Sequence, residues 1–252
     1  MPSFGKHERD CYIRIPILCF TISFRIKLLL IVCFFPNIHY LNVVVPLANG
    51  QNGILPPSPR AMYTILVNRH IVDNGFLNGI NNMAELETCI YDLIDHYQEN
   101  DDLEQIFHLI QIWGGNTGRG IYIRQHFAWQ EIEPIYRHFI DVIRSFETID
   151  DDTLNNAFVA QNVFYNSLRE NHYRGMGVAF ITKHLRFWMH RNLPNSMLPI
   201  YDSTFSENVM LRGQTANKRD LLPFWQAMIA KAEEEHVSLT ALERQLFNFF
   251  NN

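Results

Sequence analysis

Cysteine is scarce in this sequence, and most of it lies at one end. Three of the four cysteines fall within the first 33 residues, and the rest of the chain has only Cys89. No CxxC pair or Cys/His ligand spacing occurs, so the sequence predicts neither a disulfide framework nor a zinc site. We expect no metal and no other cofactor. A body with one cysteine is typical of a protein from a reducing cytosol.

A long uninterrupted apolar run is also missing. Residues 11–47 are rich in Ile, Leu, Phe and Val, but the longest clean run has eight residues, and Arg25 and Lys27 interrupt the stretch before it. A membrane-spanning helix needs about 20 apolar residues. Three interpretations of residues 1–61 stay open. They could be a leader outside the working protein, in which case Met62 is the true start; they could also be a membrane anchor or a secretory signal. The body is then residues 62–252.

Positive charge is in short supply outside that leader. Residues 1–61 carry a net charge of +4, whereas residues 62–252 carry −9. Proteins that bind nucleic acid usually present a basic surface, so the charge of the body argues against such a partner. Residues 169–191 are an exception, because they carry five basic residues and Glu170 is their only acid. The basic residues are Arg169, Arg174, Lys183, Arg186 and Arg191.

Strand signals are sparse as well. Only Tyr63–Val67 and Ile121–Arg124 are candidate strands, whereas apolar residues recur at helical spacing from Met83 onward. The sequence therefore predicts a mainly all-α fold. Helices are predicted from Met83, from Leu103 after an Asp101-Asp102 cap, at Pro134–Phe146, from about Thr153, at Val178–Met189, from Ser203, at Asp220–His236 and at Ser238–Phe250.

The most informative stretch begins with Gly175-Met176-Gly177, between two predicted helices. Glycine allows positive φ and close approach of the backbone to another surface. A helix that starts near Val178 directs free N–H groups at this turn, which favours binding of an anion such as a DNA phosphate. The alternative is an ordinary turn between helices.

Two ionisable residues follow the glycine turn. Lys183 is expected on a different face of its helix from the apolar residues Ile181 and Leu185. Asp202 follows an apolar segment and opens the next predicted helix. It could act as an N-cap that accepts backbone hydrogen bonds. It could also remain ionised and stabilise a positive charge or activate a water.

This order of elements resembles the helix-hairpin-helix DNA glycosylases, closest to the 8-oxoguanine glycosylase type. The matching features are the turn at 175–177, the helix to Met189, Pro199 and Asp202. In typical bifunctional members the nucleophilic lysine comes two residues after the second glycine, where this chain has Ala179. A divergent branch is similar in its Thr-Lys pair, here Thr182-Lys183, and in the motif at residues 113–120.

The resemblance implies a helical bundle of two lobes that flips a damaged or modified base out of duplex DNA and excises it. Asp202 would stabilise the charge at the sugar, and Lys183 would form a Schiff base or position the base or a phosphate. It also implies a cytoplasmic, nucleoid-associated monomer. The base is left open, between 8-oxoguanine-like lesions in base excision repair and a virus-type modification in antiviral defence. Expected DNA contacts are Gly175, Met176, Gly177, Arg174 and Arg119, and expected pocket residues are Trp113 and Tyr201.

Two other functions stay open. A non-catalytic DNA-binding or regulatory protein on the same scaffold would account for Ala179 and for the acidic body. A membrane-tethered helical interaction protein would require residues 1–61 to be inserted in a bilayer.

Overall fold

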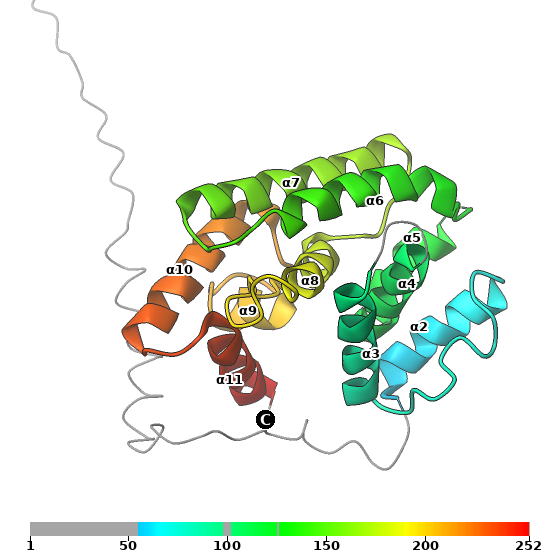
Figure 1. Cartoon of the computed structure of the whole chain (residues 1–252), viewed down its shortest axis with the longest axis horizontal. Helices are drawn as coiled ribbons and strands as arrows, with labels where there is room; N and C mark the ends of the chain where they lie inside the picture. Colours follow the sequence, from blue (N-terminus) through cyan, green and yellow to red (C-terminus); the bar gives the residue numbers. More distant parts are fainter. Residues whose placement is uncertain (1–54, 98–101, 125, 252) are drawn as a thin grey trace, which may run out of the picture. The chain divides into compact units, whose positions relative to one another are not determined.

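The computed structural model describes residues 55–97, 102–124 and 126–251 (Figure 1). The chain divides into two units, residues 1–45 and 46–252, and every described residue belongs to the second. Within these ranges the protein is helical and has no strand, which confirms the predicted all-α class. The expectations for residues 1–54 lie outside the described part of the chain.

The helices follow the predicted order with few changes. Both candidate strands were wrong: Tyr63–Val67 lies inside a helix, because Met62 and Leu66, one turn apart, are both fully buried, and Ile121–Ile123 belongs to a short helix. The elements are α2 (Pro57–Asn68), α3 (Met83–Asp95), α4 (Leu103–Gly114), η2 (Asn116–Arg119), α5 (Gly120–Ile123), α6 (Trp129–Arg144), α7 (Asp151–Glu170), α8 (Val178–Met189), α9 (Ser203–Asn208), η3 (Lys218–Asp220), α10 (Leu221–Glu234) and α11 (Leu239–Asn251).

Helix α8 lies at the centre of this arrangement. It packs against α3, α4, α6 and α7, and α6 and α7 lie side by side along their length (Figure 1). Every side chain of α8 except that of Ala179 is buried. A helix enclosed on all sides is usually apolar, but α8 contains Lys183, His184 and Arg186. The expectation that Lys183 lies away from the packed face was wrong, because neighbouring helices cover that face too.

Side chains cap several helices as their sequences predicted. The carboxylate of Asp150 accepts the Thr153 N–H at 2.8 Å, at the start of α7. Ser238 Oγ accepts the Ala241 N–H at 3.2 Å, at the start of α11. The predicted cap at Asp102 was wrong, because within the described residues its side chain makes no capping hydrogen bond at the start of α4.

The first described helix crosses the predicted boundary between residues 61 and 62. Helix α2 begins at Pro57, and its Ser58 hydroxyl accepts the Asn116 N–H at 2.8 Å. Leu55 and Pro59 are buried. The folded body therefore includes residues before Met62, because the first turn of α2 packs on the glycine-rich segment after α4. No helix in the described ranges is both long and apolar enough to cross a membrane.

Candidate functional site

Lys183 and Asp202 come together where α8 passes the start of α9. The Tyr201 N–H donates to Thr182 Oγ1 at 3.2 Å, so the residue before Asp202 is bonded to the residue before Lys183. The carboxylate charge of Asp202 acts on the Lys183 amine and raises its pKa. The sequence predicted both residues separately, and the fold places their charges within electrostatic reach of each other.

The Lys183 amine is held in an apolar environment. Its side chain is only 9% exposed, and Nζ lies over the Phe180 ring, 4.6 Å from the centroid. Burial lowers the pKa of Lys183, and Asp202 only partly offsets this effect. A lowered pKa leaves more of the amine unprotonated near neutral pH, which is the form that acts as a nucleophile.

Asp202 is the N-cap of α9, which is one of the two roles that its sequence position left open. Its Oδ1 accepts the Thr204 N–H at 3.0 Å and the Phe205 N–H at 3.3 Å, as an N-cap does. The other oxygen, Oδ2, accepts none of the hydrogen bonds found in the described chain. The side chain is half-exposed. One oxygen therefore fixes the carboxylate, and the other is left for a ligand or water.

The glycine-rich segment at residues 114–120 packs against the ring of Phe180, which lies under the Lys183 amine. A Cβ on Gly114 would stand 2.5 Å from Phe180 Cε1 and 3.2 Å from Lys183 Cδ. A Cβ on Gly118 would overlap the Phe180 ring and stand 2.6 Å from Gln111 Oε1. Glycine is required here by close packing, since only backbone fits.

Sequence reasoning missed Phe180 and Gln111. Gln111 is fully buried, and within the described residues its Oε1 has no hydrogen-bond partner. A single polar residue inside the apolar run 109–112 is a signal that could have drawn attention to it. Phe180 carried no such signal, because an aromatic residue on a buried helix is ordinary core.

The glycine turn itself differs from expectation. Gly175 has the positive φ that was predicted, +105°, but the surface it approaches is the backbone of Gly120. Gly177 has φ −90° and ψ 177°, so the expectation of a left-handed conformation there was wrong. Gly177 is exposed, and an added Cβ would meet no atom within 4 Å. Met176 is only 4% exposed and anchors the turn in the core.

The contact between Gly120 and Gly175 brings together two arginines predicted to bind DNA. Arg119 and Arg174 each precede one of these glycines, and both are exposed. The N-terminus of α8 lies nearby, and in the described chain the N–H groups of Val178 and Ala179 donate none of the hydrogen bonds found. Free N–H groups and guanidinium groups favour an anion at this surface.

The surroundings of three other residues singled out in the sequence can be compared with what was expected of them. Arg186, counted among the basic residues of the segment, is buried and paired with Glu243, so it does not contribute to an exposed basic surface. Tyr201 is fully buried and stacks on Phe224 at 4.7 Å, which leaves no ring surface for a base to contact in this structure. Trp113 is half-exposed.

A buried polar chain runs beside the site. Trp188 Nε1 donates to the Tyr136 hydroxyl at 2.7 Å, which lies 2.7 Å from Nδ1 of His184. Nε2 of His184 lies 3.0 Å from Nε2 of Gln111. Burial is the largest cause that lowers the pKa of His184, and with the nearby charges of Lys183 and His108 it brings the pKa to about 3. His184 is therefore neutral at ordinary pH.

No group of three or more His, Cys, Asp or Glu side chains in the described part of the chain is arranged to hold a metal ion. Comparison with known proteins gives no family: no family model, curated protein or solved structure matches this chain.

Proposed function

We propose that the protein is a DNA glycosylase of the helix-hairpin-helix type, a two-lobed helical protein that excises a damaged or modified base. The observation that carries the proposal is a buried lysine with a lowered pKa, Lys183, within electrostatic reach of the half-exposed carboxylate of Asp202. Lys183 lies on α8, the helix that begins directly after the glycine turn, and the first N–H groups of that helix are free in the described chain. We expect the protein to act as a monomer on duplex DNA, in the cytoplasm and without a cofactor.

The proposed chemistry begins with a flipped base, because the glycosidic bond is not accessible inside a duplex. The DNA backbone would lie on the glycine turn, with Arg119 and Arg174 on its phosphates. In its unprotonated form the Lys183 amine would attack the anomeric carbon, and the bond to the base would break with its electron pair leaving on the base, which takes a proton from water. The sugar ring would then open, its C–O electron pair going to the ring oxygen, which takes the proton lost by the amine, and a Schiff base would remain. Asp202 stabilises the positive charge that develops on the sugar. Trp113 would stack on the flipped base.

The residue at the usual lysine position favours a second candidate, a DNA-binding or regulatory protein without catalysis, because that position holds Ala179. The net charge of −9 on residues 62–252 favours a regulatory role over tight DNA binding. In that case Asp202 acts only as an N-cap.

The test is excision from duplex oligonucleotides that carry 8-oxoguanine or other modified bases, read out as abasic sites. Asp202→Asn keeps the cap but lacks the full negative charge, so we expect loss of excision with DNA binding retained. Asp150→Asn is the matched control, since Asp150 caps α7 in the same way away from the site. Full excision by Asp202→Asn would overturn the proposed mechanism.

Lys183 is tested separately, by borohydride trapping of the enzyme–DNA adduct. Lys183→Gln removes any trapped adduct if the amine forms the Schiff base, because only an amine can form that bond. If Lys183 only holds a phosphate, the variant binds DNA more weakly but excises fully at saturating protein. Binding without excision of any base in the wild-type protein would favour the regulatory alternative.

A further inference from the structure

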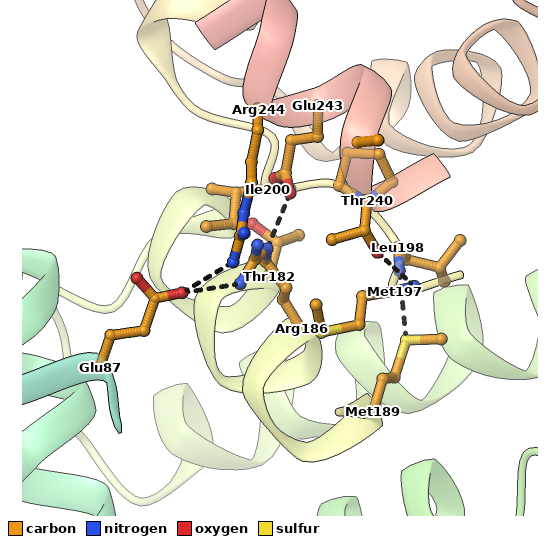
Figure 2. Close-up of polar contacts among 12 residues, drawn as sticks. Glu87, Thr182, Arg186, Met189, Met197, Leu198, Ile200, Thr240, Glu243 and Arg244 are labelled. Atoms are coloured by element: carbon orange, nitrogen blue, oxygen red, sulfur yellow. Dashed lines mark hydrogen bonds and ion pairs between the residues drawn. The ribbon is translucent and has the colours of Figure 1, made fainter. Parts of the chain in front are cut away.

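The segment that leads to Asp202 is held in place almost entirely by side chains. Residues 197–201 have no regular secondary structure, yet each has a backbone group bonded to a side chain of α8, α10 or α11. Figure 2 shows these bonds for Met197, Leu198 and Ile200. The bonds are Met197 N–H to Thr240 Oγ1 (3.3 Å), Leu198 N–H to Met189 Sδ (3.5 Å), Trp225 Nε1 to Pro199 O (3.0 Å), Ile200 N–H to Glu243 Oε1 (2.7 Å) and Tyr201 N–H to Thr182 Oγ1 (3.2 Å).

Glu243 is the only charged residue among these partners, and it divides its oxygens between two tasks. Oε1 accepts the Ile200 N–H, and Oε2 accepts from Nε of Arg186, also at 2.7 Å. Both side chains are buried, at 5% and 4% exposure. Burial lowers the pKa of Arg186, but Glu243, Tyr91 and Glu87 together outweigh it, so the pKa is raised. Arg186 is therefore charged inside the protein, with the carboxylate of Glu243 as its ion-pair partner.

Arg186 connects this pair to the lysine helix. It follows Lys183 by three residues on α8, so the two lie one turn apart. Arg186 also donates to the Tyr91 hydroxyl on α3 at 2.8 Å. Its Nη1 lies 3.9 Å from Oε1 of Glu87, a contact drawn in Figure 2. Glu243 thus joins the segment that presents Asp202 to the helix that presents Lys183.

Stability alone does not account for such a pair. A buried ion pair is often no more stabilising than apolar side chains of the same size, because both charges lose their water. A buried ion pair is better explained by its effect on geometry, because it holds the groups bonded to it in one fixed arrangement. We infer that Glu243 is a positioning residue, which sets the spacing between Asp202 and Lys183 by holding the Ile200 N–H against Arg186. As a role in catalysis, this inference rests on the proposed glycosylase function.

Removing Glu243 alone would leave Arg186 charged and unpaired in the core, so that variant could simply unfold. Two double variants avoid this problem because both carry Arg186→Met. With Glu243→Gln, the side chain still offers an oxygen to the Ile200 N–H. With Glu243→Leu, the size is similar but no acceptor remains. The comparison isolates the hydrogen bond from the buried charge.

The first readout needs no DNA. Competitive acetylation of Lys183 across a pH series, followed by mass spectrometry, gives the titration midpoint of the amine in the full-length chain. The carboxylate of Asp202 raises the pKa of Lys183, so a displaced Asp202 leaves the midpoint lower. We expect a lower midpoint in the Glu243→Leu double variant than in the Glu243→Gln one. Equal midpoints would overturn the inference, whatever the protein does to DNA.

The second readout is the single-turnover rate of borohydride trapping. Displacement of a reacting group by about 1 Å can slow a reaction about 100-fold, so we expect the Leu double variant to trap at least tenfold more slowly than the Gln one, with DNA affinity retained. Equal trapping rates would overturn the role in catalysis. Glu234→Gln, on an exposed carboxylate of α10, controls for loss of charge. A midpoint difference without excision of any base by the wild-type protein would refute the glycosylase function but keep the positioning of Asp202.

Discussion

Acid should destabilise this protein through His184, and the effect can be worked out from its surroundings. The imidazole is fully buried between Tyr136 and Gln111, and burial, together with the nearby charges of Lys183 and His108, lowers its pKa from 6.5 to about 3. Because the folded pKa lies below the unfolded value, the unfolded chain binds a proton in this window that the folded chain does not. The stabilisation is complete above pH 6.5 and is lost as the pH falls toward 3.

The magnitude follows from proton linkage. One proton difference changes the free energy of unfolding by about 1.4 kcal/mol per pH unit. Between pH 7 and pH 5, with a pKa of 6.5 in the unfolded chain and about 3 in the folded one, His184 alone removes about 2 kcal/mol. This corresponds to a fall in Tm of roughly 4–8 °C for a domain of this size. His108, also buried with a lowered pKa, adds to the decline.

The assay is urea unfolding at a series of pH values, followed by tryptophan fluorescence. His184→Gln should lower the free energy of unfolding at pH 7. That free energy should then fall less steeply toward pH 5 than in the wild type, because the unfolded variant binds about one proton fewer. His138→Gln, on the exposed face of α6, serves as the control and should keep the wild-type slope. An unchanged slope in His184→Gln would refute the reasoning, as would an equal loss of slope in the control.

Three further results are expected. Gly175→Ala should lower Tm by at least about 3 °C, because its φ is +105° and a Cβ would overlap the backbone of Gly120. Gly177→Ser should not lower Tm, and equal melting of the two variants by calorimetry would contradict this prediction. Gly177→Asp should fold normally, since the site is open and Asp is a good N-cap, yet it should lose affinity for duplex DNA at low salt; binding equal to that of Gly177→Ser would make the turn purely structural. A shortened chain that begins at Leu55 should melt like the body of the full chain, and one that begins at Met62 should melt lower because it lacks the first turn of α2; identical melting curves would exclude a role for that turn.

Local patterns predicted a large part of the fold. The bounds of α8 follow from its apolar spacing and the preceding glycine, and the caps at Asp150 and Asp202 follow from acidic residues placed directly before helices. Three helix ends were harder to predict, because they are closed without glycine. His70, His172 and His236 adopt positive φ there, a conformation in which histidine is uncommon. The amino-acid composition does not predict helix ends of this kind.

Features of the site that depend on distant pairing could not be predicted. Arg186 was counted as a candidate for DNA because its partner, Glu243, lies 57 residues away on α11. Lys183 was expected on another face than the packed one, because its helix alone does not reveal that other helices enclose it. Asp202 and Lys183 were each predicted from local sequence, but their proximity depends on the bond between Tyr201 and Thr182. Function itself stays a proposal.

The contact between Gly120 and Gly175 has a consequence for how this sequence can change over evolutionary time. Neither position can gain a side chain while the other backbone stays where it is, since each added Cβ would meet the opposite main chain. A substitution at one glycine therefore cannot be compensated by shrinking the other, which is already the smallest residue. Any descendant that keeps this turn must keep both glycines, and a lineage that loses one should show a rebuilt connection before α8 together with a rebuilt segment after α4.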